Sequence, residues 1–456
     1  MKTRWLLISC FLLLTAAASA MALAGMFQDS SELSATGNGA ADAPEPVRLV
    51  WLHHFGEDGS RKWIDSGIRK FQEKYPGVTV TVVPLNGGDY MSMLRMRVAT
   101  DEMPDLYMID NIQGARDLID SGYAADLTGK PFLERLKPEY LNGAKTEDGR
   151  IWALPIDANG LGVTYNKDVF ARAGITTVPE TWSEFLDVCR KLKMRGVTPI
   201  AAGYKENWTL FWDLAADLIP SALVANPRLI DDLSTGAATF EQSKAVFEGP
   251  FTRLAERYRY VNADPFETSW DEARSMVAEG RAAMMIGGTW SVDGVRSKRE
   301  DANIGLFPFP ASEVPGAAKF AMKSTGGIVV NPHSRHADLA MELLELYAEP
   351  ELGLSLQLNK KGISVIKEVN GNLDPALAEL NEAYMKTGRT VDWSGILPDF
   401  TDPELGRAYS AAVADYLLDP DHDLDAALRG LDEAFGQIRP AAVPNGEEET
   451  ADEEAA

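Results

Sequence analysis

The chain has 456 residues, which is too long for one hydrophobic core and predicts two or more domains. Apolar residues make up 45% of the chain and charged residues 25%, as in an ordinary soluble globular protein. The formal net charge of −24 repels nucleic acid and anionic lipid, which argues against both as partners.

The N-terminus predicts a targeting segment over residues 1–27. A positively charged start, "MKTR", precedes an apolar run without charge from Trp5 to Phe27. Small residues at Ala18–Ala20 and Ala22–Ala24 offer cleavage sites, which favours a signal peptide. A retained membrane anchor fits equally well, because a span needs roughly 20 apolar residues. Lipidation at Cys10 is a third alternative, and each of the three places the protein outside the cytoplasm.

Two further segments are expected to lack a fold. Residues 28–46 are rich in Ser, Gly, Ala and Pro, which is typical of a flexible linker, and residues 441–456 form an acidic tail expected to be disordered. Cys189 is the one cysteine that follows the targeting segment, so the body can form neither an intramolecular disulfide nor a cysteine-based zinc site.

The body begins with alternating strand and helix patterns. "VRLVWLHHF" (47–55), "VTVTVVPL" (78–85) and "PDLYMID" (104–110) are short apolar runs that predict strands. Amphipathic helices are expected between them, the first ending at Pro76-Gly77. This order predicts an α/β fold with a parallel sheet, in which ligands lie beyond the carboxyl ends of the strands.

A second alternation begins near Gly162. It predicts helices over 181–196 and 272–280 and strands over 197–204 and 281–288, and a later helix over 336–349. The strand ending in Gly287-Gly288 is followed at once by Trp290, where a phosphate-binding loop would need Gly and Lys. We therefore expect the glycines to end a buried strand and to let the backbone approach a ligand. Residues 374–438 are expected to be mostly helical.

Four blocks carry a resemblance to a known family. They are "FQEKYPGVTV", "GVTYNKDVFARAGITTVPETWSEF", "VAEGRAAMMIGGTW" and "GGIVVNPHSRHADLAMELLELYAEPE". In order and spacing they resemble family 1 extracellular solute-binding proteins, the maltose and multi-sugar receptors of bacterial ABC importers. The resemblance runs from about Val47 to about Pro440 and excludes both termini.

The resemblance implies a periplasmic-binding-protein fold of two α/β lobes with crossover strands between them. The N-terminal lobe would comprise residues 47–155 and 310–365, and the C-terminal lobe residues 156–309 and 366–440. A carbohydrate, most simply an oligosaccharide, would bind in the cleft, and ABC permease subunits would read closure of the lobes. The resemblance implies no catalysis, cofactor or metal. We expect a monomer that meets the membrane only through its N-terminal segment or the permease.

A sugar site needs aromatic faces that stack on pyranose rings and polar groups that bond to hydroxyls. Trp290 is our first candidate, with a core tryptophan beneath the cleft as the alternative. Trp208 is preferred over Trp212, which lies on the same helix face. Asp110 and Asn111 follow the third strand, where Asp110 is either a ligand contact or a helix cap.

Five weaker candidates complete the predicted site. Asp157 and Asn159 lie where the chain crosses between lobes, so they either touch the ligand or hold the hinge. His54 is one of two adjacent histidines, of which one is expected to be buried and the other to face the cleft. Lys323 leads into the returning strand, and Trp393 lies in the expected helical region.

Two alternatives to a sugar receptor remain. An extracytoplasmic glycoside-processing enzyme would need a pair of carboxylates, and 68 acidic residues single out no such pair. The spacings Gly-x-Ser-x-Gly and His-Glu-x-x-His are absent from the sequence. The same fold can also host a non-sugar solute such as a polyamine. Few histidines and no thiol pair argue against a metal.

Overall fold

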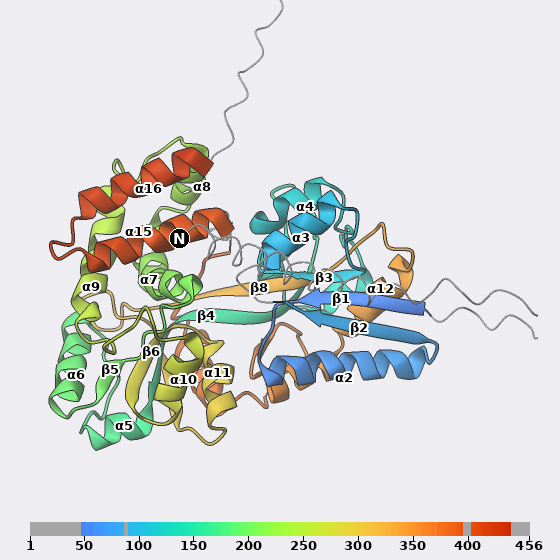
Figure 1. The fold of residues 1–456 in the computed structure, drawn as a ribbon. Coiled ribbons are helices and arrows are strands. Elements are labelled where there is room, and N and C mark those ends of the chain that lie inside the picture. The colour runs from blue at the N-terminus through green and yellow to red at the C-terminus, as the bar shows by residue number, and fades with distance from the viewer. Residues whose placement is uncertain (1–46, 86–89, 370, 395–402, 439–456) are drawn as a thin grey trace, which may run out of the picture. The chain divides into compact units, whose positions relative to one another are not determined.

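The fold was analysed in a computed structural model that describes residues 47–85, 90–369, 371–394 and 403–438 (Figure 1). The predicted targeting segment, flexible linker and acidic tail lie outside these residues. No helix of the described ranges combines the length and the apolar character that crossing a bilayer requires.

The first elements confirm the predicted strand and helix alternation. The chain runs through β1 (Val47–His53), α2 (Asp58–Lys74), β2 (Val78–Pro84), α3 (Tyr90–Ala99) and β3 (Leu106–Ile109). Strand β1 pairs in parallel with β2 on one side and β3 on the other. Helix α2 forms because its apolar residues recur at helical spacing, and it buries that face, including Trp63 and Phe71. This part of the chain is the parallel α/β unit that the pattern predicts.

Short helical segments connect β3 to the next strand. They are η2 (Gln113–Ala115), α4 (Arg116–Asp120), η3 (Pro131–Arg135) and η4 (Pro138–Ala144).

Two long antiparallel strands run through the middle of the sheet. Strand β4 (Leu154–Asn166) has 13 residues and β8 (Phe320–Val330) has 11. They lie side by side (Figure 1), in a register that joins Leu154 to Ile328 and Leu161 to Ala321. The sheet has the order β2-β1-β3-β8-β4-β6-β5. Both strands therefore connect the first parallel unit with the strands that follow β4.

The segment between β4 and β8 is a second α/β unit. Strand β4 pairs with β6 (Ala282–Gly288) and β7 (Ile304–Phe307), and β5 (Thr198–Ile200) pairs in parallel with β6. The helices of this segment are α5 (Lys167–Arg172), α6 (Trp182–Met194), α7 (Asn207–Ser221), η5 (Leu223–Ala225), α8 (Leu229–Thr235), α9 (Lys244–Tyr258), α10 (Trp270–Ala278) and α11 (Ser291–Lys298).

Helix α6 shows why these residues form a helix here. Thr181 and Glu184 form a reciprocal capping box that satisfies the first backbone N–H groups. Phe185, Cys189 and Leu192 recur on one helix face and are fully buried. Cys189 is therefore a core residue of this helix.

Among the described residues after β8, the expected helical region is interrupted by the strand β10. They are α12 (Ala337–Leu346), α13 (Pro350–Ser355), η6 (Leu356–Lys360), β9 (Ile363–Ser364), α14 (Pro375–Leu380), η7 (Asn381–Met385), β10 (Thr390–Asp392), α15 (Pro403–Leu418) and α16 (Leu424–Ile438). Trp393 does not lie in a helix as expected, because β10 pairs in parallel with β8 and the backbone N–H of Trp393 continues this pairing to Met322. Helices α15 and α16 pack on each other, and α15 packs on α7.

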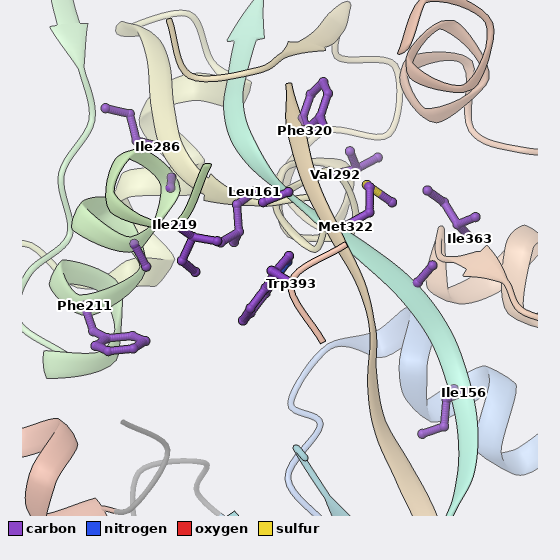
Figure 2. Close-up of a cluster of buried hydrophobic side chains, with 14 of the residues drawn as sticks. Ile156, Leu161, Phe211, Ile219, Ile286, Val292, Phe320, Met322, Ile363 and Trp393 are labelled. Atoms are coloured by element: carbon purple, nitrogen blue, oxygen red, sulfur yellow. The ribbon is translucent and has the colours of Figure 1, made fainter. Parts of the chain in front are cut away.

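The apolar core continues across the crossing strands. In Figure 2, Leu161 of β4 and Met322 of β8 lie near Trp393, and Phe211 and Ile219 of α7 belong to the same cluster. All five side chains are buried. This core fixes the backbone that carries the polar and aromatic side chains described next.

Candidate ligand-binding site

Three tryptophans from distant parts of the chain form one cluster. The ring centroid of Trp212 lies 5.5 Å from that of Trp290 and 5.8 Å from that of Trp393, and both contacts are edge to face. Trp212 and Trp290 are half-buried, whereas Trp393 is buried. We call Trp212, Trp290 and Trp393 the tryptophan cluster. Its partly exposed rings are apolar surfaces that a ligand can cover.

The position of Trp290 depends on the glycine before it. Strand β6 is buried along its whole length and ends at Gly288, which confirms that the two glycines end a buried strand. A Cβ atom on Gly288 would lie 1.9 Å from Cζ3 of Trp290. The absence of a side chain at Gly288 therefore makes room for the ring of Trp290.

Lys323 of β8 lies against the tryptophan cluster. Its Nζ is 4.0 Å from the ring centroid of Trp393 and 6.0 Å from that of Trp212. The residue is 8% exposed, and within the described residues its ammonium has no hydrogen bond or ion pair. Burial lowers the pKa of Lys323 to about 8, although the negative charges of Asp110 and Asp392 act in the opposite direction.

Asp157 and Asn159 form a buried polar network on β4. Asn159 is paired with Lys323 in the β4–β8 register, so Asp157, Asn159 and Lys323 share one face of the sheet. Lys360 donates to Oδ2 of Asp157 over 2.5 Å, and Asn159 donates to Oδ1 of Asp157 over 3.3 Å. The hydroxyl of Thr289 donates to Oδ1 of Asn159 over 2.7 Å. The network thus joins β4 to the residue that precedes Trp290.

The electrostatics of Lys360 explain why this network can be buried. Burial is the largest single effect and lowers the pKa of Lys360, but the carboxylates of Asp157, Asp293 and Glu57 together outweigh it, so the pKa is raised. Pairing with Asp157 therefore offsets the penalty of an isolated buried charge on Lys360.

His54, Asp110 and Asn111 lie together at the carboxyl ends of β1 and β3. Nε2 of His54 is 3.2 Å from Oδ1 of Asp110, whose side chain is 59% exposed. The helix cap proposed for Asp110 is instead made by Asn111, whose Oδ1 accepts from the backbone N–H of Gly114 over 2.7 Å. Nδ2 of Asn111 is buried and has no partner within the described ranges. This amide group can therefore donate to a ligand.

The neighbouring histidine has a different environment. His53 is 1% exposed, and its Nδ1 accepts from the backbone N–H of Phe55. Burial lowers the pKa of His53 to about 4, assisted by the positive charges of His54 and Arg61. The expectation that one histidine of the pair is buried is confirmed, and the buried one is neutral.

Trp208 lies outside the tryptophan cluster. It is 36% exposed and contacts Trp270 edge to face at 5.1 Å. The structure brings Trp212 to the cluster, one turn further along α7.

A second group of charged residues lies beside Lys360. The carboxyl of Asp293 on α11 is buried, and burial raises its pKa to about 7. The positive charge of Lys360 lowers this pKa, and the negative charge of Glu57 raises it. A Cβ atom on Gly59 would lie 2.7 Å from Oδ1 of Asp293, so α2 begins in close contact with α11. Arg274 of α10 lies 3.8 Å from Glu57, the residue that precedes α2.

We also looked for other candidate sites, namely a surface hollow and a metal-binding group. A surface hollow of about 580 Å³ lies along α6 and is lined by Asp187, Arg190, Lys191, Lys193, Met194, Arg259 and Tyr260. Within the part of the chain that the structure describes, no group of three or more His, Cys, Asp or Glu side chains is arranged to hold a metal ion. The tryptophan cluster with its polar neighbours remains the candidate site.

Comparison with known proteins now identifies the family. The pattern that defines the bacterial extracellular solute-binding proteins matches residues 57–353. The chain belongs to this family. The multiple sugar-binding protein of Streptococcus mutans is 27% identical over 308 residues, which cover 64% of this chain and 69% of the relative. The melibiose/raffinose/stachyose-binding protein MelE of Bacillus subtilis is 26% identical over 247 residues, which cover 53% of this chain and 56% of MelE.

A solved structure confirms the fold of this solute-binding protein. The solute-binding protein RafE in complex with raffinose matches with a TM-score of 0.72 at 20% identity, over 86% of this chain and 100% of that chain. The two-lobe fold expected from the sequence is thereby confirmed. The family is one of extracellular binding proteins.

Sequence reasoning about this solute-binding protein missed three contributors to the site. They are Trp212, in whose place Trp208 is expected, Lys360, and Thr289, which precedes Trp290. Lys360 lies 203 positions from its partner Asp157, so no local pattern could join them. The adjacency of Thr289 to a glycine-ended strand was the one signal available.

Proposed function

We propose that this protein is the extracytoplasmic substrate-binding component of an ABC importer, and that it binds an oligosaccharide between its two lobes. The tryptophan cluster carries the proposal, because two half-buried rings and one buried ring lie beside the polar side chains of Lys323 and Asn159. Stacking on a pyranose ring buries apolar area at roughly 25 cal/mol per Å². The relatives named for multiple sugars and for melibiose, raffinose and stachyose support a carbohydrate ligand.

We assign the two lobes on the basis that the chain crosses from one to the other through the long strands β4 and β8. The N-terminal lobe comprises residues 47–155 and 310–365, and the C-terminal lobe residues 156–309 and 366–440. A ligand shifts the equilibrium between open and closed arrangements only if it contacts both lobes. Closure is the signal that the permease subunits receive.

The remaining parts of the proposal concern chemistry and location. The protein binds its ligand without altering it, needs no cofactor and acts as a monomer. It lies in the periplasm or is tethered to the outer face of the cell membrane, and it meets that membrane only through residues 1–27 or the permease.

A thermal-shift screen of the purified protein against neutral and charged mono- and oligosaccharides tests the proposal. A ligand that binds only the folded state raises the unfolding temperature by mass action, by the equivalent of about 2.7 kcal/mol at a concentration of 100 Kd. We expect at least one oligosaccharide to produce such a shift and to be recovered intact after prolonged incubation. Conversion of an oligosaccharide over multiple turnovers would instead support the alternative, a glycoside-processing enzyme. A shift with spermidine and none with any sugar would support a polyamine receptor.

A further inference from the structure

Lys323 differs from the other buried cationic side chains of the described residues. Arg257, Lys323 and Lys360 are all less than 10% exposed. Arg257 lies 2.6 Å from the carboxylate of Asp213, and Lys360 lies 2.5 Å from that of Asp157. Lys323 has aromatic rings beside its ammonium but no carboxylate partner within these residues. Of these three charges, that of Lys323 is the one for which the described part of the chain supplies no hydrogen-bonded counter-ion.

The nearest carboxylates do not fill this role. Asp110 acts on Lys323 through its charge, but its Oδ1 lies 3.2 Å from Nε2 of His54. Asp392 also acts at a distance, and its exposed side chain accepts from the backbone N–H of Ser394 over 2.9 Å. Both groups favour the charged form of Lys323 without forming a hydrogen bond to it.

A second donor without an acceptor lies next to Lys323. Nε1 of Trp393 belongs to the ring whose centroid is 4.0 Å from Nζ of Lys323, and it is buried with no hydrogen-bond partner in the described ranges. An ammonium and an indole N–H side by side present donors only. An ionised carboxylate has acceptors and no donor, so it matches these two donors, and its negative charge neutralises the ammonium. A neutral sugar hydroxyl would bond to one donor and leave the charge in place.

We propose that the bound oligosaccharide contains a uronic acid residue, and that Lys323 forms an ion pair with the carboxylate of that residue. The inference rests on the proposed carbohydrate-binding function and specifies its ligand class. The tryptophan cluster supplies stacking surfaces for the sugar rings, while Lys323 and Nε1 of Trp393 select the acidic substituent. Arrangements of this kind discriminate strongly, because a ligand without the carboxylate leaves buried donors unpaired.

Calorimetric titration with matched pairs of acidic and neutral sugars tests the inference. One pair is trigalacturonate and galactotriose of the same linkage, and another is a uronate-terminated cellotriose and cellotriose itself. The wild-type protein is compared with Lys323→Gln, which keeps hydrogen-bond donors without charge, and with Lys323→Arg, which keeps the charge. We expect one uronate to bind at least about tenfold more tightly than its neutral counterpart. Lys323→Gln should abolish most of this preference, and Lys323→Arg should retain part of it.

The outcomes separate this inference from the proposed function. Binding of neutral sugars without a preference for uronates overturns the uronate assignment and leaves the receptor function intact. Unchanged uronate affinity in Lys323→Gln overturns the role of Lys323. If no sugar of either class binds the folded protein, the proposed function itself fails. Circular dichroism and the unfolding temperature of each variant confirm that a loss of binding is not a loss of fold.

Discussion

The ring of Trp212 meets the ring of Trp290 edge to face, with their centroids 5.5 Å apart. One ring comes from helix α7 and the other follows strand β6, 78 positions later by the difference of their residue numbers. Trp212 also meets Trp393, so it lies at the centre of the tryptophan cluster. Truncating any ring of such a group removes its contacts with the other rings as well as with a ligand.

Replacing Trp290 or Trp212 with Ala should weaken oligosaccharide binding by at least about tenfold, because buried aromatic anchors contribute most to affinity. Trp208→Ala is the matched control, since Trp208 lies on the same helix as Trp212 but packs on Trp270. Its affinity should stay within about twofold of wild type. Titration calorimetry measures all three variants. Equal losses in Trp208→Ala and Trp212→Ala would show that the cluster does not define the site.

Replacing Asp157 with Ala should reduce the free energy of unfolding by about 3–5 kcal/mol, because it leaves Lys360 buried without a partner. The control is Lys244→Ala, which breaks the exposed ion pair with Asp425 and should change stability by less than about 1 kcal/mol. Urea denaturation measures both variants. The double change Asp157→Asn with Lys360→Met should be less destabilising than Asp157→Ala, and a larger loss would contradict the desolvation argument.

Replacing Gly288 with Ala should displace the ring of Trp290, because the new Cβ would lie 1.9 Å from Cζ3. Overpacking of this kind destabilises by about 1–3 kcal/mol, and we expect a loss of ligand affinity with it. Gly430→Ala in helix α16 is the control, since a Cβ there meets no atom within 4 Å. It should stabilise the protein by up to about 1 kcal/mol through helix propensity. Tryptophan fluorescence of the two variants reports whether the ring has moved.

Stability should fall as the pH decreases from about 6.5 to about 4, with a contribution from His53. In this window the unfolded chain binds a proton at His53 and the folded chain does not, so the unfolded state is favoured progressively. The difference between a pKa of 6.5 and one of about 4 corresponds to at most about 3.4 kcal/mol. Urea unfolding across this pH range should show a shallower dependence in His53→Gln. An unchanged dependence would assign the acid sensitivity to other groups.

The sequence predicted those features that depend on neighbours along the chain. Helix α2 and strands β1 to β3 follow from apolar periodicity, and the end of β6 at Gly288 follows from its glycines. It did not predict which tryptophan of α7 meets Trp290, because Trp208 and Trp212 share a helix face and differ only in what lies opposite them. Strand β10 was missed since its three residues are held by pairing with a distant strand. The ion pair of Asp157 with Lys360 is likewise a product of long-range folding.

Cys189 lies in the core of helix α6 with no exposed surface, and burial raises the pKa of its thiol. A thiol in this state does not react with alkylating reagents until the helix opens to water. In a chain that begins after the targeting segment, Cys189 is the single thiol, so the extent of alkylation records how often the region around α6 opens. The protein thereby contains an internal reporter of its own opening, readable by mass spectrometry without an engineered probe.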